Sequence, residues 1–297
     1  MRANTKTPRL NLYSATHMPI LDNPSLGSAV QWFGLDTPER YQKNPHPTLT
    51  LTSVIYRFNS LGYRCAEFDQ ANPDPRPFSV VTLGASEALG VGVPEELTVS
   101  RLFCNWVGKH LGRPVIDWNL GYGGRGADFM TRTLVSALPV LRPNIVLLLF
   151  PHPARREVIR PDGSIFHFNP HGQNSLSAKL LNPEKHMLTE ACLDLGSGYN
   201  DEVNLFMNWQ VCRSLCEQHH VMWLYAGLRD HFFNRIKHLL DSDHWVRPGL
   251  GDLKQHFNDQ PALALARDMQ HPGIAPHERM AEQLFERWRQ LYPDRVA

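Results

Sequence analysis

The apolar run from Asn144 to Phe150 is the feature that most limits how this chain of 297 residues can fold. A continuous run of this kind is typical of a strand buried on both faces of a parallel sheet. Segments with strand and helix periodicity alternate around it. The expected strands are 78–83, 115–120, 144–150 and 221–225, and the expected helices are 98–111, 127–141, 204–219 and 276–291. This alternation predicts an α/β fold whose parallel sheet is covered by helices on both faces.

The residues before this alternating region differ in composition. They are rich in Pro, Asn and Thr, and we expect residues 1–77 to form an irregular N-terminal extension and linker, with a strand at 50–56. Prolines at positions 73, 75 and 77 preclude a continuous helix or paired strand in the linker. A domain of residues 78–297 is expected to follow. Inside it, the polar stretch 157–201 is too long for an ordinary connection, and we interpret it as a lid or a disordered insert.

Charge and hydropathy argue against nucleic acid as a partner and against a segment that spans a membrane. Lys and Arg number 30 and Asp and Glu number 29, and there is no basic block, so nucleic acid is not an expected partner. No apolar segment of the signal-peptide kind follows the charged first residues. The longest apolar run is far too short to span a bilayer. We therefore expect no membrane span.

The 5 cysteines are loosely spaced and odd in number, which fits reduced thiols in a cytoplasmic protein better than a disulfide framework. Cys212 and Cys216 lie one helical turn apart, a spacing more typical of the buried face of a helix than of a metal site. No feature of the sequence calls for a metal or an organic cofactor. The oligomeric state is not indicated by the sequence.

A serine follows the first expected strand in a glycine-rich turn. The strand runs into Gly84-Ala85-Ser86, and Gly90 and Gly92 follow shortly after. A serine at such a turn is exposed, and the backbone N–H groups around it can face a carbonyl oxygen. Glycine permits the required backbone geometry. The alternative interpretation is a serine that only caps the next helix.

Two further motifs carry complementary chemistry. The loop from Asn119 to Gly126 contains four glycines, so its backbone can approach a ligand closely and supply an N–H donor. Asp268 and His271 stand three residues apart, where His271 can act as a base and Asp268 can set its tautomer. A flexible turn and a chance polar pair are the corresponding alternatives. Serine, histidine and aspartate together are the parts of an activated nucleophile.

The order and context of these motifs resemble the SGNH hydrolases, also called the GDSL esterase/lipase family, over roughly 79–291. The segment 81–94 looks like the block that holds the nucleophile, 119–124 like the block whose last glycine gives an oxyanion N–H, and 266–273 like the D-x-x-H block. The segment 56–64 is also similar to one that often precedes this domain in bacterial members. The resemblance implies a three-layer α/β/α flavodoxin-like domain with the N-terminal extension packed on it.

This sequence departs from the family pattern at two places. Ala85 stands where the G-D-S motif has aspartate, which need not harm the nucleophile. More seriously, no asparagine follows the third strand, although the family's third block uses one to complete the oxyanion hole. Losing one such donor commonly costs about two to three orders of magnitude in rate. His152 and Arg155, in the Pro-rich loop after that strand, are the nearest replacements, and structural contacts within the loop are their alternative role.

The resemblance implies a serine esterase or deacylase. Ser86 would attack an ester or thioester, His271 would accept its proton, and Asp268 would orient His271. The N–H groups of Ser86 and Gly124 would hold the oxyanion, with Gly84 and Asn119 as supporting residues. The substrate would be a small-molecule or carrier-bound acyl ester. Acyl transfer through the same acyl-enzyme is one alternative, and a non-catalytic binding module that keeps the fold is another.

Overall fold

Five parallel strands form the central sheet, in the order β4-β3-β5-β8-β9. Their bounds are β3 Phe78–Gly84, β4 Val115–Asn119, β5 Ile145–Phe150, β8 Met222–Gly227 and β9 Trp245–Val246. In chain order this is 2-1-3-4-5, the flavodoxin-like arrangement. This computed structural model describes residues 28–68, 77–159, 165–169, 187, 189–193, 196, 198–227, 230–247 and 261–293.

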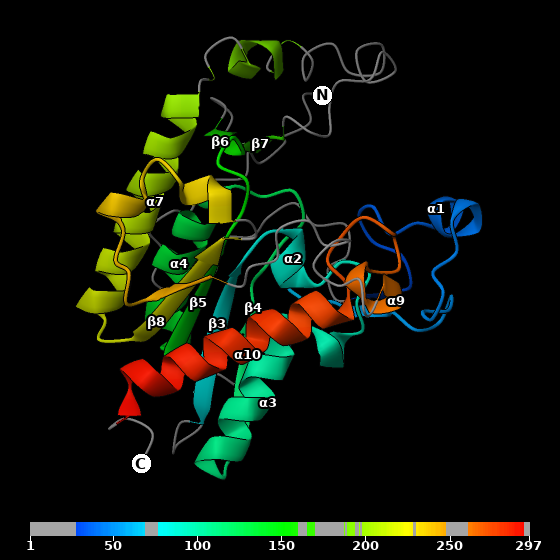
Figure 1. Ribbon diagram of the computed structural model, residues 1–297, viewed down its shortest axis with the longest axis horizontal. Helices are drawn as coiled ribbons and strands as arrows, with labels where there is room; N and C mark the ends of the chain where they lie inside the picture. Colours follow the sequence, from blue (N-terminus) through cyan, green and yellow to red (C-terminus); the bar gives the residue numbers. More distant parts are fainter. Residues whose placement is uncertain are drawn as a thin grey trace, which may run out of the picture.

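Helices cover both faces of the sheet, as the alternating pattern predicts (Figure 1). α3 (Val99–Leu111) packs with α10 (Ile274–Leu291) on one face, and α4 (Ala127–Leu141) packs with α7 (Gly198–Gln218) on the other. Shorter helical elements are α1 Pro38–Lys43, α2 Ser86–Leu89, α9 Pro261–Ala264, and the 3₁₀ turns η2 Glu95–Leu97, η3 Asp230–Phe233 and η4 Lys237–Leu239. The result is the expected α/β/α layering.

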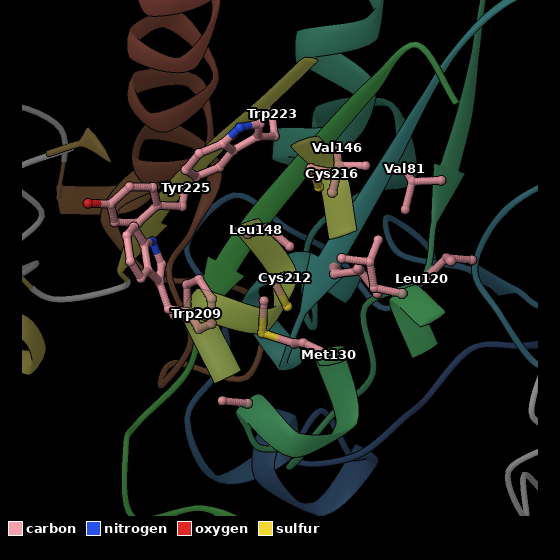
Figure 2. Close-up of a cluster of buried hydrophobic side chains, with 14 of the residues drawn as sticks. Val81, Leu120, Met130, Val146, Leu148, Trp209, Cys212, Cys216, Trp223 and Tyr225 are labelled. Atoms are coloured by element: carbon pink, nitrogen blue, oxygen red, sulfur yellow. The ribbon is translucent and has the colours of Figure 1, made fainter. Parts of the chain in front are cut away.

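Successive residues of the inner strands pack into two separate cores. Val146 and Leu148 of β5 face α4 and α7, together with Trp209, Cys212 and Cys216 of α7 (Figure 2). Their neighbours in the strand join the opposite cluster with α3 and α10. All six residues of β5 are buried, so the apolar run is explained by burial on both faces. Each such side chain contributes about 1.5–3 kcal/mol relative to exposure.

The ends of the helices have local causes. Thr98 caps α3, because its side-chain oxygen accepts a hydrogen bond from the Arg101 N–H. The same helix ends at Gly112, which adopts the left-handed conformation at φ 64°. α4 has the bounds that the periodicity predicts. α7 begins at Gly198 rather than at 204, and α10 at Ile274 rather than at 276, which leaves Pro276 in its first turn where proline is tolerated.

The N-terminal segment 28–68 packs on the rest of the protein in two places. Val54, Tyr56 and Phe58 form a small core with Leu89 and Val91, and Tyr63 and Cys65 join the larger core. β1 (Ala29–Val30) pairs antiparallel with β2 (Tyr56–Arg57). The strand expected at 50–56 is wrong except for its last residue. The hydroxyl of Ser53 accepts from the Thr50 N–H and closes a local turn, which competes with strand pairing. Most of the linker 71–77 lies outside the described residues, and the proposed domain boundary stays a prediction.

The 157–201 stretch begins with an antiparallel hairpin, β6 Arg156–Ile159 and β7 Ile165–Phe168, that the sequence did not indicate. Much of the remainder lies outside the described residues, so a lid remains a prediction. Within the described part of the chain, no helix is both long enough and apolar enough to cross a membrane. Cys212 and Cys216 are fully buried, in agreement with their expected place on the inner face of a helix.

Candidate active site

Ser86 stands where the first strand of the sheet turns into a helix. β3 ends at Gly84, and Ser86 is the first residue of α2. The exposure expected for this serine is wrong, because Ser86 is 5% exposed and the Asp268 turn packs against the chain that follows it. A Cβ on Gly84 would lie 2.7 Å from the Leu149 carbonyl oxygen and 2.8 Å from the Ala88 Cβ, so only glycine fits at this turn. As the first residue of its helix, Ser86 has an N–H without an intrahelical partner. This backbone N–H can therefore donate a hydrogen bond to a negatively charged oxygen.

The glycine-rich loop after β4 is packed against α2. Asn119 donates to the Ala88 carbonyl at 2.8 Å and accepts from the Gly121 N–H at 3.0 Å. A Cβ on Gly121 would lie 2.6 Å from the Leu89 nitrogen, which explains the glycine. Asn119 therefore has a structural role that ties the two loops together. Gly124 has φ 75° and open space around its Cβ position, and its N–H donates no hydrogen bond to any residue the structure describes.

Asp268 and His271 form a closed turn before α10. The His271 Nδ1 lies 2.5 Å from Oδ2 of Asp268, and the backbone N–H groups of Gln270 and His271 each donate to Oδ1 at 3.0 Å. Met269 adopts φ 57° to close the turn. The Asp268 side chain is fully buried, whereas that of His271 is 13% exposed. The carboxylate therefore holds the ring by Nδ1 and leaves Nε2 for other chemistry.

The pair is electrostatically coupled. Burial raises the pKa of Asp268, but the hydrogen bonds and charge from His271 outweigh it, and the pKa lies below its usual range. Burial lowers the pKa of His271, but the hydrogen bond and charge of Asp268 prevail, with a further contribution from Glu87, and its pKa lies above the usual value. Glu87 was not singled out from the sequence, although it directly follows Ser86.

The turn with Ser86 and the turn with Asp268 lie against each other. The Arg267 N–H donates to the Gly92 carbonyl at 2.9 Å, and a Cβ on Gly92 would lie 2.8 Å from the Ala266 Cβ. Glu87, next to Ser86, is close enough for its charge to act on His271. Among the described residues, however, no hydrogen bond joins the Ser86 hydroxyl to the His271 ring. The structure thus brings Asp268 and His271 together and places Ser86 in an adjacent turn.

The loop after β5 approaches the same region. The Arg155 backbone packs against the glycine-rich loop, since a Cβ on Gly126 would lie 2.5 Å from its carbonyl oxygen. The Arg155 charge acts to lower the pKa of His271. Its Nε is buried and has no hydrogen-bond partner in the described chain. His152 instead accepts from the Ala154 N–H at 3.2 Å, with its ring 5.0 Å from that of Phe232.

A second D-x-x-H pair shows that this motif alone is not diagnostic. Asp241 and His244 make the same contact between Oδ2 and Nδ1, at 3.0 Å. Here the His244 ring stacks on Trp223 at 4.1 Å, and its Nε2 lies 3.1 Å from the Tyr292 hydroxyl. This pair belongs to the packing around β8. Only the pair beside the Ser86 turn keeps Nε2 unbonded within the described structure. Nor does that part of the chain contain a group of three or more His, Cys, Asp or Glu side chains suited to a metal ion.

Known proteins resemble this chain in structure only. No family model and no curated protein matches its sequence. Among solved structures, the lipase Lip_vut3 from a goat rumen metagenome is 14% identical with a TM-score of 0.46, over 71% of this chain and 97% of that one. The psychrotrophic esterase EstA from Pseudoalteromonas sp. is 11% identical with a TM-score of 0.43, over 73% and 99%. The acetylxylan esterase Axe2 from Geobacillus stearothermophilus, as its catalytic mutant, is 13% identical with a TM-score of 0.42, over 71% and 93%.

A lipolytic protein of the G-D-S-L family from Desulfitobacterium hafniense is also among the matches, at 12% identity and a TM-score of 0.42. At identities of 11–15% the likeness concerns the fold and does not assign the site residues. What Ser86, Asp268 and His271 do has to follow from their own surroundings.

Proposed function

We propose that this protein is a serine esterase or deacylase that works through an acyl-enzyme on Ser86. The observation that carries this proposal is the buried Asp268 carboxylate bonded to Nδ1 of His271, whose Nε2 makes no hydrogen bond to the described residues and lies beside the turn that contains Ser86. A histidine held in this way has the tautomer that a general base requires. The different environment of His244, which lies away from this turn and whose Nε2 is occupied by the Tyr292 hydroxyl, supports the same choice.

The proposed reaction has two halves. Oγ of Ser86 attacks the acyl carbonyl as its proton passes to Nε2 of His271, and the C–O or C–S bond to the leaving group then breaks as His271 returns the proton. Water attacks the acyl-enzyme in the second half with the same proton transfers. We propose that substrate binding brings the Ser86 hydroxyl into line with Nε2, since catalytic hydrogen bonds often tighten only when substrate binds.

The oxyanion would be held by backbone donors and one cation. Among the described residues, the N–H groups of Ser86 and Gly124 have no acceptor that competes for them. We propose Arg155 as the third donor in place of the missing asparagine, because its buried Nε is unbonded and its charge reaches His271. His152 is the weaker candidate, because its Nδ1 is already used within its own loop.

The substrate is proposed to be a small-molecule or carrier-bound acyl ester. An acyltransferase would share the acyl-enzyme and differ in the group that accepts the acyl chain; exclusion of water by a closed 157–201 stretch would favour it. A binding module would not need a histidine whose Nε2, within the described residues, is left unbonded beside a serine. This arrangement therefore favours catalysis over binding alone.

The test is labelling by a fluorophosphonate together with turnover of a small ester. The wild-type protein should become labelled on Ser86, and Ser86→Ala should lose both labelling and turnover while its thermal unfolding stays close to that of the wild type. Ser136→Ala is the matched control, because Ser136 is also buried and its hydroxyl has no partner among the described residues. Full turnover in Ser86→Ala would refute the assignment of the nucleophile.

A further inference from the structure

Arg267, which directly precedes Asp268, extends its side chain into the N-terminal segment. The side chain is fully buried and pairs with the equally buried Asp36 at 2.6 Å. It also donates to the carbonyl oxygens of Leu51 at 2.7 Å, Val54 at 3.3 Å and Gln31. A buried guanidinium is stable only when its charge and its donors are satisfied, and here all the partners come from residues 31–54.

Tyr56 links the same ion pair to the turn that follows Ser86. Its hydroxyl donates to Oδ2 of Asp36 at 2.5 Å and accepts from the Gly92 N–H at 2.7 Å. Burial and the Asp36 carboxylate raise the pKa of Tyr56, so the hydroxyl keeps its proton and can make both bonds. One hydroxyl thus connects the Ser86 side of the site to the Asp268 side.

Two further side chains of the N-terminal segment bind the same two turns. Arg64 donates to the carbonyl oxygens of Leu89, Gly90 and Val93, at 3.1, 2.7 and 3.0 Å. His46 places Nε2 2.9 Å from the carbonyl oxygen of Leu265. Figure 1 shows the blue N-terminal segment beside the orange segment that leads into α10. Every one of these contacts falls on 89–93 or 265–267, the chain that flanks the proposed catalytic residues.

We propose that Asp36, Tyr56 and Arg267 are positioning residues, and that the N-terminal segment is a built-in part of the active site that sets the place of the Asp268–His271 pair relative to Ser86. This inference rests on the proposed function. The segment also packs on the sheet domain away from the two turns, where Tyr63 and Cys65 join the larger core and Phe68 lies against Trp118. Hydrogen bonds concentrated on the two turns instead fix their separation, on which the rate of attack depends steeply.

The sensitive variant is Tyr56→Phe, which removes the bridging hydroxyl and keeps the ring. The variant retains the stacking of this ring on Phe58. It also retains the contact with the Arg64 guanidinium, which lies 4.7 Å from the centroid of the Tyr56 ring. Tyr63→Phe is the control, because the Tyr63 hydroxyl is buried in the same segment and hydrogen-bonds to neither turn. Both variants should fold.

Two measurements decide the outcome. For Tyr56→Phe we expect kcat per labelled Ser86 to fall about tenfold with KM little changed, since a small misplacement is costly. The His271 pKa, followed by NMR of its ring, should move down toward the ordinary histidine value, because a loosened Asp268 supports the charged ring less. The Tyr63→Phe protein should match the wild type in both. Equal kcat and an unchanged His271 pKa in Tyr56→Phe would overturn the inference, even if its melting temperature fell.

The NMR titration also separates this inference from the proposed function. If the wild-type protein is not labelled at Ser86, the proposed function fails, whereas the His271 titration still reports whether the hydroxyl of Tyr56 holds the pair in place. The other charged and titratable groups around this pair are unchanged in both variants. The charges of Glu87 and Arg155 shift the pKa of His271. His271 lowers the pKa of His277, and Asp268 acts to raise the pKa of His46.

Discussion

Asp268 holds His271 at two points, with Oδ2 2.5 Å from the ring Nδ1 and Oδ1 accepting the His271 backbone N–H at 3.0 Å. The carboxylate therefore sets both the position of the residue and the tautomer of its ring. These contacts lie within one turn of the chain. The proposed transfer of the Ser86 proton would depend on how that turn is held against the neighbouring one.

Asp268→Asn should reduce kcat by up to about four orders of magnitude, because an amide can donate to Nδ1 and so favour the wrong tautomer. The remaining amide oxygen can still accept the backbone N–H groups, so the turn should survive. Asp241→Asn is the matched control, since Asp241 makes the same contact with His244 away from the site. Steady-state kinetics on a small ester compare the two. A comparable loss in both variants would mean that Asp268 acts only through the fold.

The pH dependence of kcat/KM should follow the ionisation of His271. Asp268 raises the pKa of the ring, and only the neutral ring accepts the Ser86 proton, so kcat/KM should rise with pH. Its midpoint should lie above about 6.5, the ordinary histidine value. A profile measured from about pH 5 to 9 covers the transition. A flat profile across this range would exclude His271 as the base.

Arg155→Ala should lower kcat about a hundredfold with little change in KM, if its guanidinium stabilises the oxyanion only in the transition state. His152→Ala should have a smaller effect on kcat. Arg156→Ala is the control, because that neighbouring arginine pairs with Asp201 at 2.8 Å. Loss of activity in His152→Ala alone would reverse the assignment, and no loss in either would leave two backbone donors as the whole oxyanion hole.

His277 should make the protein sensitive to acid. It is buried, and its Nδ1 accepts from the Val99 N–H at 2.9 Å. Burial and the charges of Arg64 and His271 lower its pKa to about 3. The unfolded chain binds this proton near pH 6.5, so stability should decline as the pH falls from about 6.5 toward 3, by at most about 1.4 kcal/mol per pH unit for this one group. Thermal unfolding at several pH values measures the slope.

The variant His277→Gln should show a shallower decline in melting temperature between neutral and acid pH, although it will be less stable at neutral pH. His238→Gln, at an exposed position, should keep the wild-type slope. If the slope were the same in His277→Gln as in the wild type, the acid sensitivity would have to come from another group, of which the partly buried His167 is the first to test, since burial and two arginines lower its pKa to about 3 as well.

The sequence by itself determined the elements and the local chemistry. The apolar run of β5 and the periodicity of α4 reflect interactions between near neighbours and a simple choice of buried face, so the α/β layering and the α4 bounds could be predicted. The contact of Asp268 with His271 is likewise local, because three residues of a tight turn suffice to make it. The serine turn after β3 was visible for the same reason.

Only the tertiary structure decided which of these local features belong to one site. Asp241 and His244 have the same spacing as Asp268 and His271, and it is the packing around Trp223 and Tyr292 that assigns them another role. The role of Arg267 depends on Asp36, at the other end of the chain. Such a pair has no sequence periodicity, because its partners meet only after the sheet has formed and the N-terminal segment has folded against it. The buried ion pair of Arg267 with Asp36 therefore fixes the arrangement of turns that the sequence motifs alone leave open.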